Sequence, residues 1–187
     1  MVTAPPVPCC HASRADLLPG ELARDGITLR PQNEADLDFI RDLYVANRWA
    51  EVAAAPGWTD DMRRAFLYDQ ARLQWLHYSK YYADAQFLII ESRGARIGRL
   101  YLSYQAPDDV RIVEISFLPH CTGHGLGTRF LVQVQKIAAG LGRSCSLHVE
   151  GHNRAHRLYL RNGFIDYKLE GSHYLMVWQP PAQQKMA

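Results

Sequence analysis

The apolar positions of this chain follow two different periods. Apolar residues recur every three or four positions in four segments, which predicts four helices, and seven short apolar or alternating runs bounded by turn residues predict strands. The strands are expected at residues 27–30, 86–91, 96–104, 110–119, 144–150, 165–169 and 173–178. Their order with the helices, β-α-α-β-β-β-α-β-α-β-β, predicts an α/β (mixed α+β) domain with one mixed sheet and helices on both faces.

The first two helices are marked by residues that can cap them. Asn33 can cap a helix whose pattern is broken by residues 47–58, and Thr59 can cap a second helix that is expected to end near Tyr82. The side chains that share one face of the first helix are Leu37, Ile40 and Tyr44. The apolar stripe of the second helix consists of Met62, Phe66, Leu73 and Leu76. Such stripes are expected on the side of a helix that faces the core.

Three glycines at alternate positions lie between the strand at 110–119 and the third helix at 126–141: Gly123, Gly125 and Gly127. Glycines here leave backbone N–H groups bare at a helix N-terminus, where an anion such as a pyrophosphate can be held. The spacing differs from the G-x-G-x-x-G of dinucleotide-binding folds, and the lysine of a P-loop is absent. The loop therefore predicts a phosphate-bearing cofactor.

Length, charge and cysteine content narrow the class of protein. The 187 residues fit one domain at 27–178, with tails at 1–26 and 179–187. The 21 Lys and Arg and 19 Asp and Glu residues give a net charge of +2, which gives no support for a nucleic-acid partner. Neither a signal peptide nor a run of roughly 20 apolar residues that would span a membrane is found. The cysteines show no C-x-x-C spacing, so a reduced, cytoplasmic protein is expected.

Two stretches of the chain resemble the GNAT superfamily of acyl-CoA-dependent N-acyltransferases in its bacterial form. The segment HCTGHGLGT is similar to the family's Q/R-x-x-G-x-G/A loop, with Gly125 and Gly127 on its two required glycines. The segment LHVEGHNRAHRLYLRNGF is similar to a second family motif, and the residues that carry this likeness are Leu147, Val149, Asn153, Ala155, Leu158, Tyr159, Gly163 and Phe164. The resemblance covers about residues 27–178.

The resemblance implies both a fold and an activity. The fold is the GNAT fold, a mostly antiparallel mixed sheet of about seven strands splayed between the fourth and the fifth. The activity is that of an N-acetyltransferase, which transfers the acetyl group of acetyl-CoA to a primary amine, on a small molecule or a peptide, by direct attack in a ternary complex. A homodimer is left open. The alternative is a non-catalytic acyl-CoA-binding regulatory or interaction module on the same fold.

Two residues are candidates for the chemistry. Glu114 lies in a strand that is expected to be buried, where an ionised carboxylate is costly unless paired, and a buried carboxyl group suits a general base that takes a proton from an ammonium. The alternative for Glu114 is a salt bridge to a neighbouring-strand arginine such as Arg99. The resemblance places at Tyr159 the tyrosine that protonates the departing CoA thiolate. The alternative is that Tyr159 packs and hydrogen-bonds the sulfur.

The resemblance also assigns the residues that bind acetyl-CoA. The pyrophosphate is expected on the backbone of Thr122, Gly123, His124, Gly125, Leu126, Gly127 and Thr128. The pantetheine arm is expected against Asn153 and Tyr159 and along the backbone of Phe117 and Leu118. An N–H group near Leu118 can also polarise the thioester carbonyl.

One position of the loop departs from the family pattern. Thr122 stands where the family usually has Arg or Gln, so a long polar side chain near the phosphates is missing. We expect weakened rather than abolished CoA binding, because the family holds the pyrophosphate mainly through backbone N–H groups. Arg129 or Arg154 can supply the missing charge.

The acceptor site is expected between the first two helices and at the closing hairpin, and its candidate residues are Arg48, Glu51, Trp58 and Tyr174. Two tryptophans, Trp49 and Trp58, can bind a cationic amine together with Glu51 through cation–π contacts and ion pairing. The alternative is that these side chains are ordinary packing residues.

Neither a metal nor a covalent enzyme intermediate is expected. The histidines His148, His152 and His156 run from strand to loop to helix and do not share one face as metal ligands would. Cys121 lies beside the glycine loop, but the family generally uses direct attack, so a loop cysteine without a function is the preferred interpretation.

Overall fold

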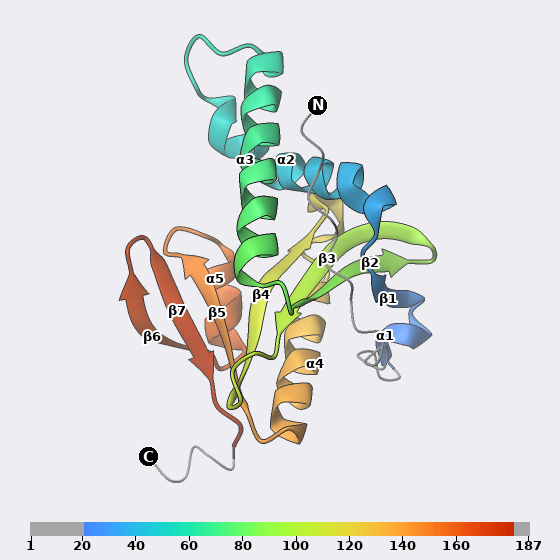
Figure 1. The fold of residues 1–187 in the computed structure, drawn as a ribbon, viewed down its shortest axis with the longest axis vertical. Helices are drawn as coiled ribbons and strands as arrows, with labels where there is room; N and C mark the ends of the chain where they lie inside the picture. The colour runs from blue at the N-terminus through green and yellow to red at the C-terminus, as the bar shows by residue number, and fades with distance from the viewer. Residues whose placement is uncertain (1–20, 182–187) are drawn as a thin grey trace.

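A seven-stranded mixed sheet in the order β1-β2-β3-β4-β5-β7-β6 runs through the computed structural model, which describes residues 21–181 (Figure 1). The strands are β1 Ile27–Pro31, β2 Gln86–Ser92, β3 Ala95–Ser103, β4 Asp109–Phe117, β5 Ser144–Glu150, β6 Ile165–Glu170 and β7 His173–Trp178. Neighbouring strands are antiparallel except β4 and β5, which are parallel. The predicted mixed sheet is confirmed. The outer parts of the two predicted tails, residues 1–20 and 182–187, lie outside the described residues.

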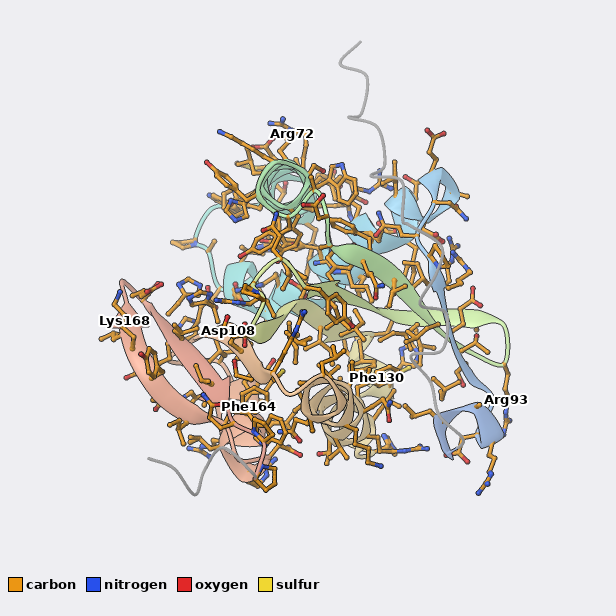
Figure 2. The ribbon with its side chains drawn as sticks, turned by 60° about the horizontal axis from the view of Figure 1, so that its bottom comes forward. Arg72, Arg93, Asp108, Phe130, Phe164 and Lys168 are labelled. Carbon is orange, nitrogen blue, oxygen red and sulfur yellow. The ribbon has the colours of Figure 1, made fainter. Side chains whose placement is uncertain are left out.

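Helices cover both faces of the sheet, as predicted. In the described chain they are α1 Glu21–Arg24, α2 Leu37–Ala53, α3 Asp60–Tyr81, α4 Leu126–Gly140 and α5 Ala155–Arg161, with 3₁₀ turns at Glu34–Asp36 and Pro119–Cys121. α2 and α3 lie on one face, and α4 and α5 lie on the other. Figure 2 shows this separation, with Arg72 on α3 and Phe130 on α4 on opposite sides of the sheet.

Most of the apolar core lies between the sheet and the pair α4 and α5. Alternate residues of a strand point to one face, and on this face Ile112 of β4 and Leu147 of β5 belong to one buried cluster with Phe130 of α4 and Tyr159 of α5. Leu22 of α1 belongs to the same cluster, so the predicted N-terminal tail includes packed residues. A smaller cluster lies on the α3 face and consists of Ala85, Phe87 and Tyr101 with Trp75, Tyr78, Tyr82 and Val113.

α2 is longer than predicted. It continues to Ala53 instead of breaking at residue 47, because its last residues are mostly helix formers and the first proline after it is Pro56. The predicted cap of α3 is present, because the Thr59 hydroxyl accepts a hydrogen bond from the N–H of Met62. Asn33 caps the 3₁₀ turn Glu34–Asp36 instead of α2, whose own N-cap is Asp36.

The predicted inward stripe of α3 is wrong. Its members are 38% to 50% exposed, and they are Met62, Phe66, Leu73 and Leu76. The buried side chains of α3 are Leu67 and Ala71, one turn apart, and the same side of the helix continues to Trp75 and Tyr78 above the sheet. The reason is that the first half of this 22-residue helix extends past the sheet, where α2 crosses it, so only its second half covers strands (Figure 1).

β4 and β5 separate halfway along their length. Their parallel pairing runs from Asp109 with Ser144 to Ile112 with Leu147 and then stops, although both strands continue. At the same level the pairing of β4 with β3 shifts register, so that Val113 is an extra, bulged residue. A bulge bends a strand and increases its twist, which accounts for the opening between β4 and β5.

Candidate functional site

A cavity of about 370 Å³ lies where β4 and β5 separate. Its wall includes four residues predicted from sequence to form the site, Arg48, Glu114, Asn153 and Tyr159, together with Tyr78. Arg48 and Tyr78 come from α2 and α3 on one face of the sheet, and Tyr159 comes from α5 on the other face. The opening between the strands therefore connects side chains that an unbroken sheet would keep apart.

Glu114 is held on both of its carboxylate oxygens. The Tyr78 hydroxyl donates a hydrogen bond of 2.8 Å to Oε2, and Nη2 of Arg99 lies 3.5 Å from Oε1. Arg99 is only 3% exposed, and it also donates to Gln74 on α3 and to Ser116 on β4. The salt bridge to Arg99 that the sequence left as an alternative is present, and Glu114 also lines the cavity, so the two interpretations of Glu114 are compatible.

Tyr159 is buried at the other wall of the cavity. Its ring lies 5.9 Å from that of Phe164, which follows α5. Burial raises the pKa of the Tyr159 phenol well above its usual value, and the negative charge of Glu114 raises it further. The hydroxyl therefore keeps its proton at neutral pH and is available as a donor toward the cavity.

The glycine loop leads directly into the N-terminus of α4. Gly125 is the N-cap of α4 and has a φ of 78°, and Gly123 has a φ of 85°, a conformation that residues with a Cβ rarely adopt. A Cβ at either position would meet no atom within 4 Å, so the loop surface is open on this side. Gly127 has a different role, because a Cβ there would lie 3.1 Å from the Leu158 side chain, and its absence lets α4 approach α5.

The side chains around the loop are partly engaged with the protein itself. The Thr122 hydroxyl donates to the carbonyl of Pro119 at 2.7 Å, and the exposed His124 ring contacts the carbonyl of Thr122. Arg129 lies 2.6 Å from Asp25 in an ion pair, whereas Arg154 is exposed. Of the two arginines expected to compensate for Thr122, Arg129 is thus already in an ion pair, and the role of either one in compensating for Thr122 stays a prediction.

The backbone of Leu118 already has partners. Its N–H donates to the carbonyl of Ile97 at 2.8 Å, and its carbonyl accepts from the N–H of Cys121 at 2.9 Å. The backbone groups of an antiparallel strand point alternately to its two sides, so those of Phe117 and Ile115 point toward the opening between β4 and β5. The expected pantetheine contact thus fits the backbone of Phe117, whereas the N–H of Leu118 is not free to polarise a carbonyl.

Asn153 has the capping role that was one of its two predicted roles. Its side-chain oxygen accepts a hydrogen bond of 2.9 Å from the N–H of Ala155 at the start of α5. The residue is exposed and lines the cavity. The second role, contact with the cofactor, stays a prediction.

The expected cage of two tryptophans and Glu51 is not formed. The Trp58 ring packs edge-on against Phe66 with 5.3 Å between centroids, and the guanidinium carbon of Arg64 lies 5.5 Å from the centroid of the Trp49 ring. The two indoles are occupied by different partners on the extension of α2 and α3, away from the cavity walls. Both tryptophans thus have the packing contacts that the alternative interpretation expected.

Of the four predicted acceptor residues, only Arg48 lines the cavity. Its Nη1 lies 3.0 Å from Glu51 and 3.2 Å from Glu150 at the end of β5, so it joins α2 to the sheet across the cavity mouth. The Tyr174 ring instead packs on His156 with 5.2 Å between centroids. Glu51 and Tyr174 are thus beside the site rather than in its wall.

Among the cavity residues that sequence reasoning did not assign to the site are Tyr78, Arg111 and His148. Tyr78 lies 36 residues before Glu114, and only the packing of α3 on the sheet brings them together. Nη1 of Arg111 lies 2.7 Å from Nδ1 of His148, whose Nε2 lies 3.1 Å from Glu170. Arg111 could have been noticed in the sequence, because it is a charged residue between two apolar neighbours in the strand that precedes the glycine loop.

The histidines around the site are tied to separate carboxylates. His148, His152 and His156 face Glu170, Glu150 and Asp166 respectively. Within residues 21–181, no three side chains of His, Cys, Asp or Glu gather as a metal site would require. No helix in that part of the chain has the length and apolar composition needed to cross a membrane.

Comparison with known proteins agrees with this geometry. The family model described as "Acetyltransferase (GNAT) family" matches residues 43–164 of the chain. No curated protein matches the sequence. Among solved structures, the PaiA N-acetyltransferase of Thermoplasma acidophilum in complex with coenzyme A has 20% identity and a TM-score of 0.61, covering 82% of this chain and 99% of that one.

Two further structures show the same likeness. An acetyltransferase of Streptococcus agalactiae has 16% identity and a TM-score of 0.58, covering 83% of this chain and 99% of that one. A chimera of the SpeG spermidine N-acetyltransferase of Vibrio cholerae and hSSAT has 19% identity and a TM-score of 0.55, covering 86% of this chain and 97% of that one. At these identities the likeness shows the fold, and the predicted splayed sheet of seven strands is confirmed.

Proposed function

The chain belongs to the GNAT acetyltransferase family, and from this premise we propose that it transfers the acetyl group of acetyl-CoA to a primary amine in a ternary complex. The observation that carries the proposal is the cavity at the β4–β5 opening, whose walls include both Glu114 and Tyr159. The reaction needs one group that takes a proton from the amine and another that gives a proton to the departing thiolate. These two side chains are of the right types for the two tasks.

The N-terminus of α4 fits the pyrophosphate of acetyl-CoA. The first N–H groups of a helix have no partner within the helix, and the helix dipole favours an anion there. The left-handed Gly125 and the open space beside Gly123 and Gly125 leave these groups accessible. Bound there, acetyl-CoA supplies a thioester whose carbonyl carbon accepts the amine. The outward-pointing backbone of Phe117 then lies beside the pantetheine arm.

Glu114 acts as the proton acceptor for the ammonium, directly or through a water. Arg99 stabilises the ionised carboxylate, which is the form that a base requires. The hydrogen bond from Tyr78 fixes Oε2 and leaves other lone pairs of the carboxylate available. Tyr159 acts as the proton donor, because its phenol is protonated at neutral pH and lines the same cavity as Glu114.

Acetyl-CoA-dependent release of free thiol tests the activity. We expect the purified protein to release thiol from acetyl-CoA when a suitable member of a panel of polyamines, amino acids, aminoglycosides and peptides is added. Thermal stabilisation by acetyl-CoA, measured in parallel, reports binding. Stabilisation without release from any amine would favour the non-catalytic CoA-binding module, and the absence of both would contradict acetyl transfer.

Gly125→Ala is expected to weaken acetyl-CoA binding by about tenfold or more, because an alanine at a φ of 78° costs about 1–2 kcal/mol and displaces the N–H groups at the start of α4. Isothermal titration calorimetry with acetyl-CoA measures the change. The matched control is Gly140→Ala near the other end of α4, where a Cβ has open space and φ is not left-handed. If the two variants bound acetyl-CoA equally well, the loop would not be the pyrophosphate site.

A further inference from the structure

We propose that the acceptor amine also carries a carboxylate group and that Arg111 is the residue that binds this carboxylate. The inference rests on the acetyl-transfer proposal and names the class of acceptor that it would use. It follows from how the charged side chains around the cavity are paired, from how Arg111 is held, and from where the β4 bulge places it relative to Glu114.

The acidic side chains in the cavity wall already have arginine partners. Glu114 faces Arg99 at 3.5 Å and accepts from Tyr78, as described above. Glu150 faces Arg48 at 3.2 Å. A polyamine acceptor needs carboxylates for its additional ammonium groups, and each of these two already has an arginine beside it.

In the described part of the chain, the guanidinium of Arg111 has no carboxylate at hydrogen-bonding distance. Within residues 21–181 its nearest carboxylate oxygen is Oδ2 of Asp109, 4.0 Å from Nε. The two oxygens of Asp109 accept hydrogen bonds from the hydroxyls of Ser144 and Ser146. Arg111 is 26% exposed and lines the cavity. It is therefore a cation directed at the cavity whose charge is only partly compensated.

His148 and Glu170 hold Arg111 in a fixed orientation. An arginine can only donate, so Nδ1 of His148 accepts from Nη1 of Arg111 and the imidazole proton lies on Nε2. That proton is donated to Glu170 at 3.1 Å. Burial lowers the pKa of His148 and the charge of Arg111 lowers it further, which keeps the ring neutral in this role. One edge of the guanidinium is thus anchored while its remaining N–H groups can bind a carboxylate in the fork geometry that arginine favours.

The bulge at Val113 brings Arg111 and Glu114 to the same side of the sheet. Residues three apart in a regular strand point to opposite faces. Here Arg111 lies opposite Ser103 and Glu114 lies opposite Tyr101, two residues apart on β3 and therefore on one face. Two residues along a strand correspond to about 7 Å between their Cα atoms. A molecule with an amine and a carboxylate a few bonds apart can reach both residues, as an amino acid does.

Matched pairs of amines that differ only in the carboxylate provide the test. The pairs are L-lysine with cadaverine, L-ornithine with putrescine, and 4-aminobutyrate with propylamine. With acetyl-CoA saturating, we expect kcat/KM for the carboxylated member of at least one pair to exceed that of its partner by about tenfold or more. Arg111→Gln is expected to bring that ratio close to one, mainly through a higher KM for the carboxylated amine. Arg111→Lys keeps the positive charge but lacks the two parallel N–H donors of the guanidinium, and it is expected to retain part of the preference for the carboxylated amine.

Arg72→Gln is the control, because Arg72 is exposed on α3 and paired with Asp69. It should leave the ratio unchanged.

Wild-type protein that acetylates the decarboxylated members as well as the carboxylated ones would overturn this inference and leave acetyl transfer intact. A ratio that persists in Arg111→Gln would overturn the role of Arg111. Thiol release from none of these six amines would overturn this inference, and only the absence of release across the whole amine panel described above would overturn acetyl transfer as well.

Discussion

Tyr159→Phe is expected to lower kcat by about 100-fold or more while the Kd of acetyl-CoA stays within about twofold of wild type. The substitution removes the hydroxyl and keeps the ring, whose packing against Phe164 holds α5 on the sheet. Without the phenol, the departing thiolate must take its proton from water. Thiol release at saturating substrates gives kcat, and calorimetry on the same preparations gives the Kd.

The pKa of Tyr159 sharpens this expectation. Burial, and then the negative charge of Glu114, raises it above the value of 10.0 that an unperturbed tyrosine has. The phenol therefore stays protonated through the neutral range, and a fall of wild-type kcat between neutral pH and that value has its origin in another group. Tyr167→Phe, on the exposed strand β6, is the control and should keep wild-type turnover. Turnover of Tyr159→Phe equal to wild type would refute the acid role, and equal losses in kcat and acetyl-CoA affinity would assign Tyr159 to binding.

The features that could be predicted from the sequence are those set by short-range physics. Asn33 caps a 3₁₀ turn and Thr59 caps a helix because a side-chain oxygen reaches an N–H two or three residues away. The loop ends at Gly125 because the chain enters α4 with a left-handed φ, which glycine adopts without a steric penalty. Tyr159 could be placed in the site from the motif around it, since the motif, the turn and α5 form one continuous segment.

The wrong predictions depend on which segment covers which. Helical periodicity identifies an apolar side of α3, and we took that side for the one that faces the core. Periodicity does not show that the first half of α3 lies beyond the end of the sheet. Once α3 extends beyond the sheet, the buried side is decided by α2, and the small Ala71 beside Leu67 meets it better than Phe66 does. Leu118 was assigned a free N–H because the alternation of backbone groups along β4 depends on its register with β3.

The salt bridge of Glu114 to Arg99 was among the alternatives read from the sequence, but the tyrosine partner of Glu114 and the partners of Arg111 were beyond sequence reasoning for the same reason. Tyr78 reaches Glu114 from a helix whose rotation about its own axis was assigned incorrectly. Arg111 shares a face with Glu114 only because Val113 is bulged, and nothing in the local sequence marks that bulge. The charges themselves were visible in the chain, but their pairing is a tertiary property.

Glu114→Gln is expected to lower kcat/KM by about 100-fold near neutral pH, with a loss that shrinks as the pH rises toward the pKa of the acceptor amine. The reason is that the variant can use only the fraction of amine that is already deprotonated. For an alkyl amine with a pKa near 10.4 that fraction rises about tenfold per pH unit below the pKa. The measurement is kcat/KM for the amine from pH 6 to pH 10, for wild type and variant in the same buffers.

A purely structural role of Glu114 gives a different result. The variant leaves Arg99, 3% exposed, opposite a neutral amide, which we expect to cost about 1–3 kcal/mol of the free energy of unfolding in urea. Tyr78→Phe removes the other contact of the carboxylate and should also cost stability while retaining the proton acceptor. If activity simply follows stability, both variants lose it by a factor that does not change with pH. A pH-dependent loss confined to Glu114→Gln is the result that a general base requires, because only that variant lacks a group to take the proton.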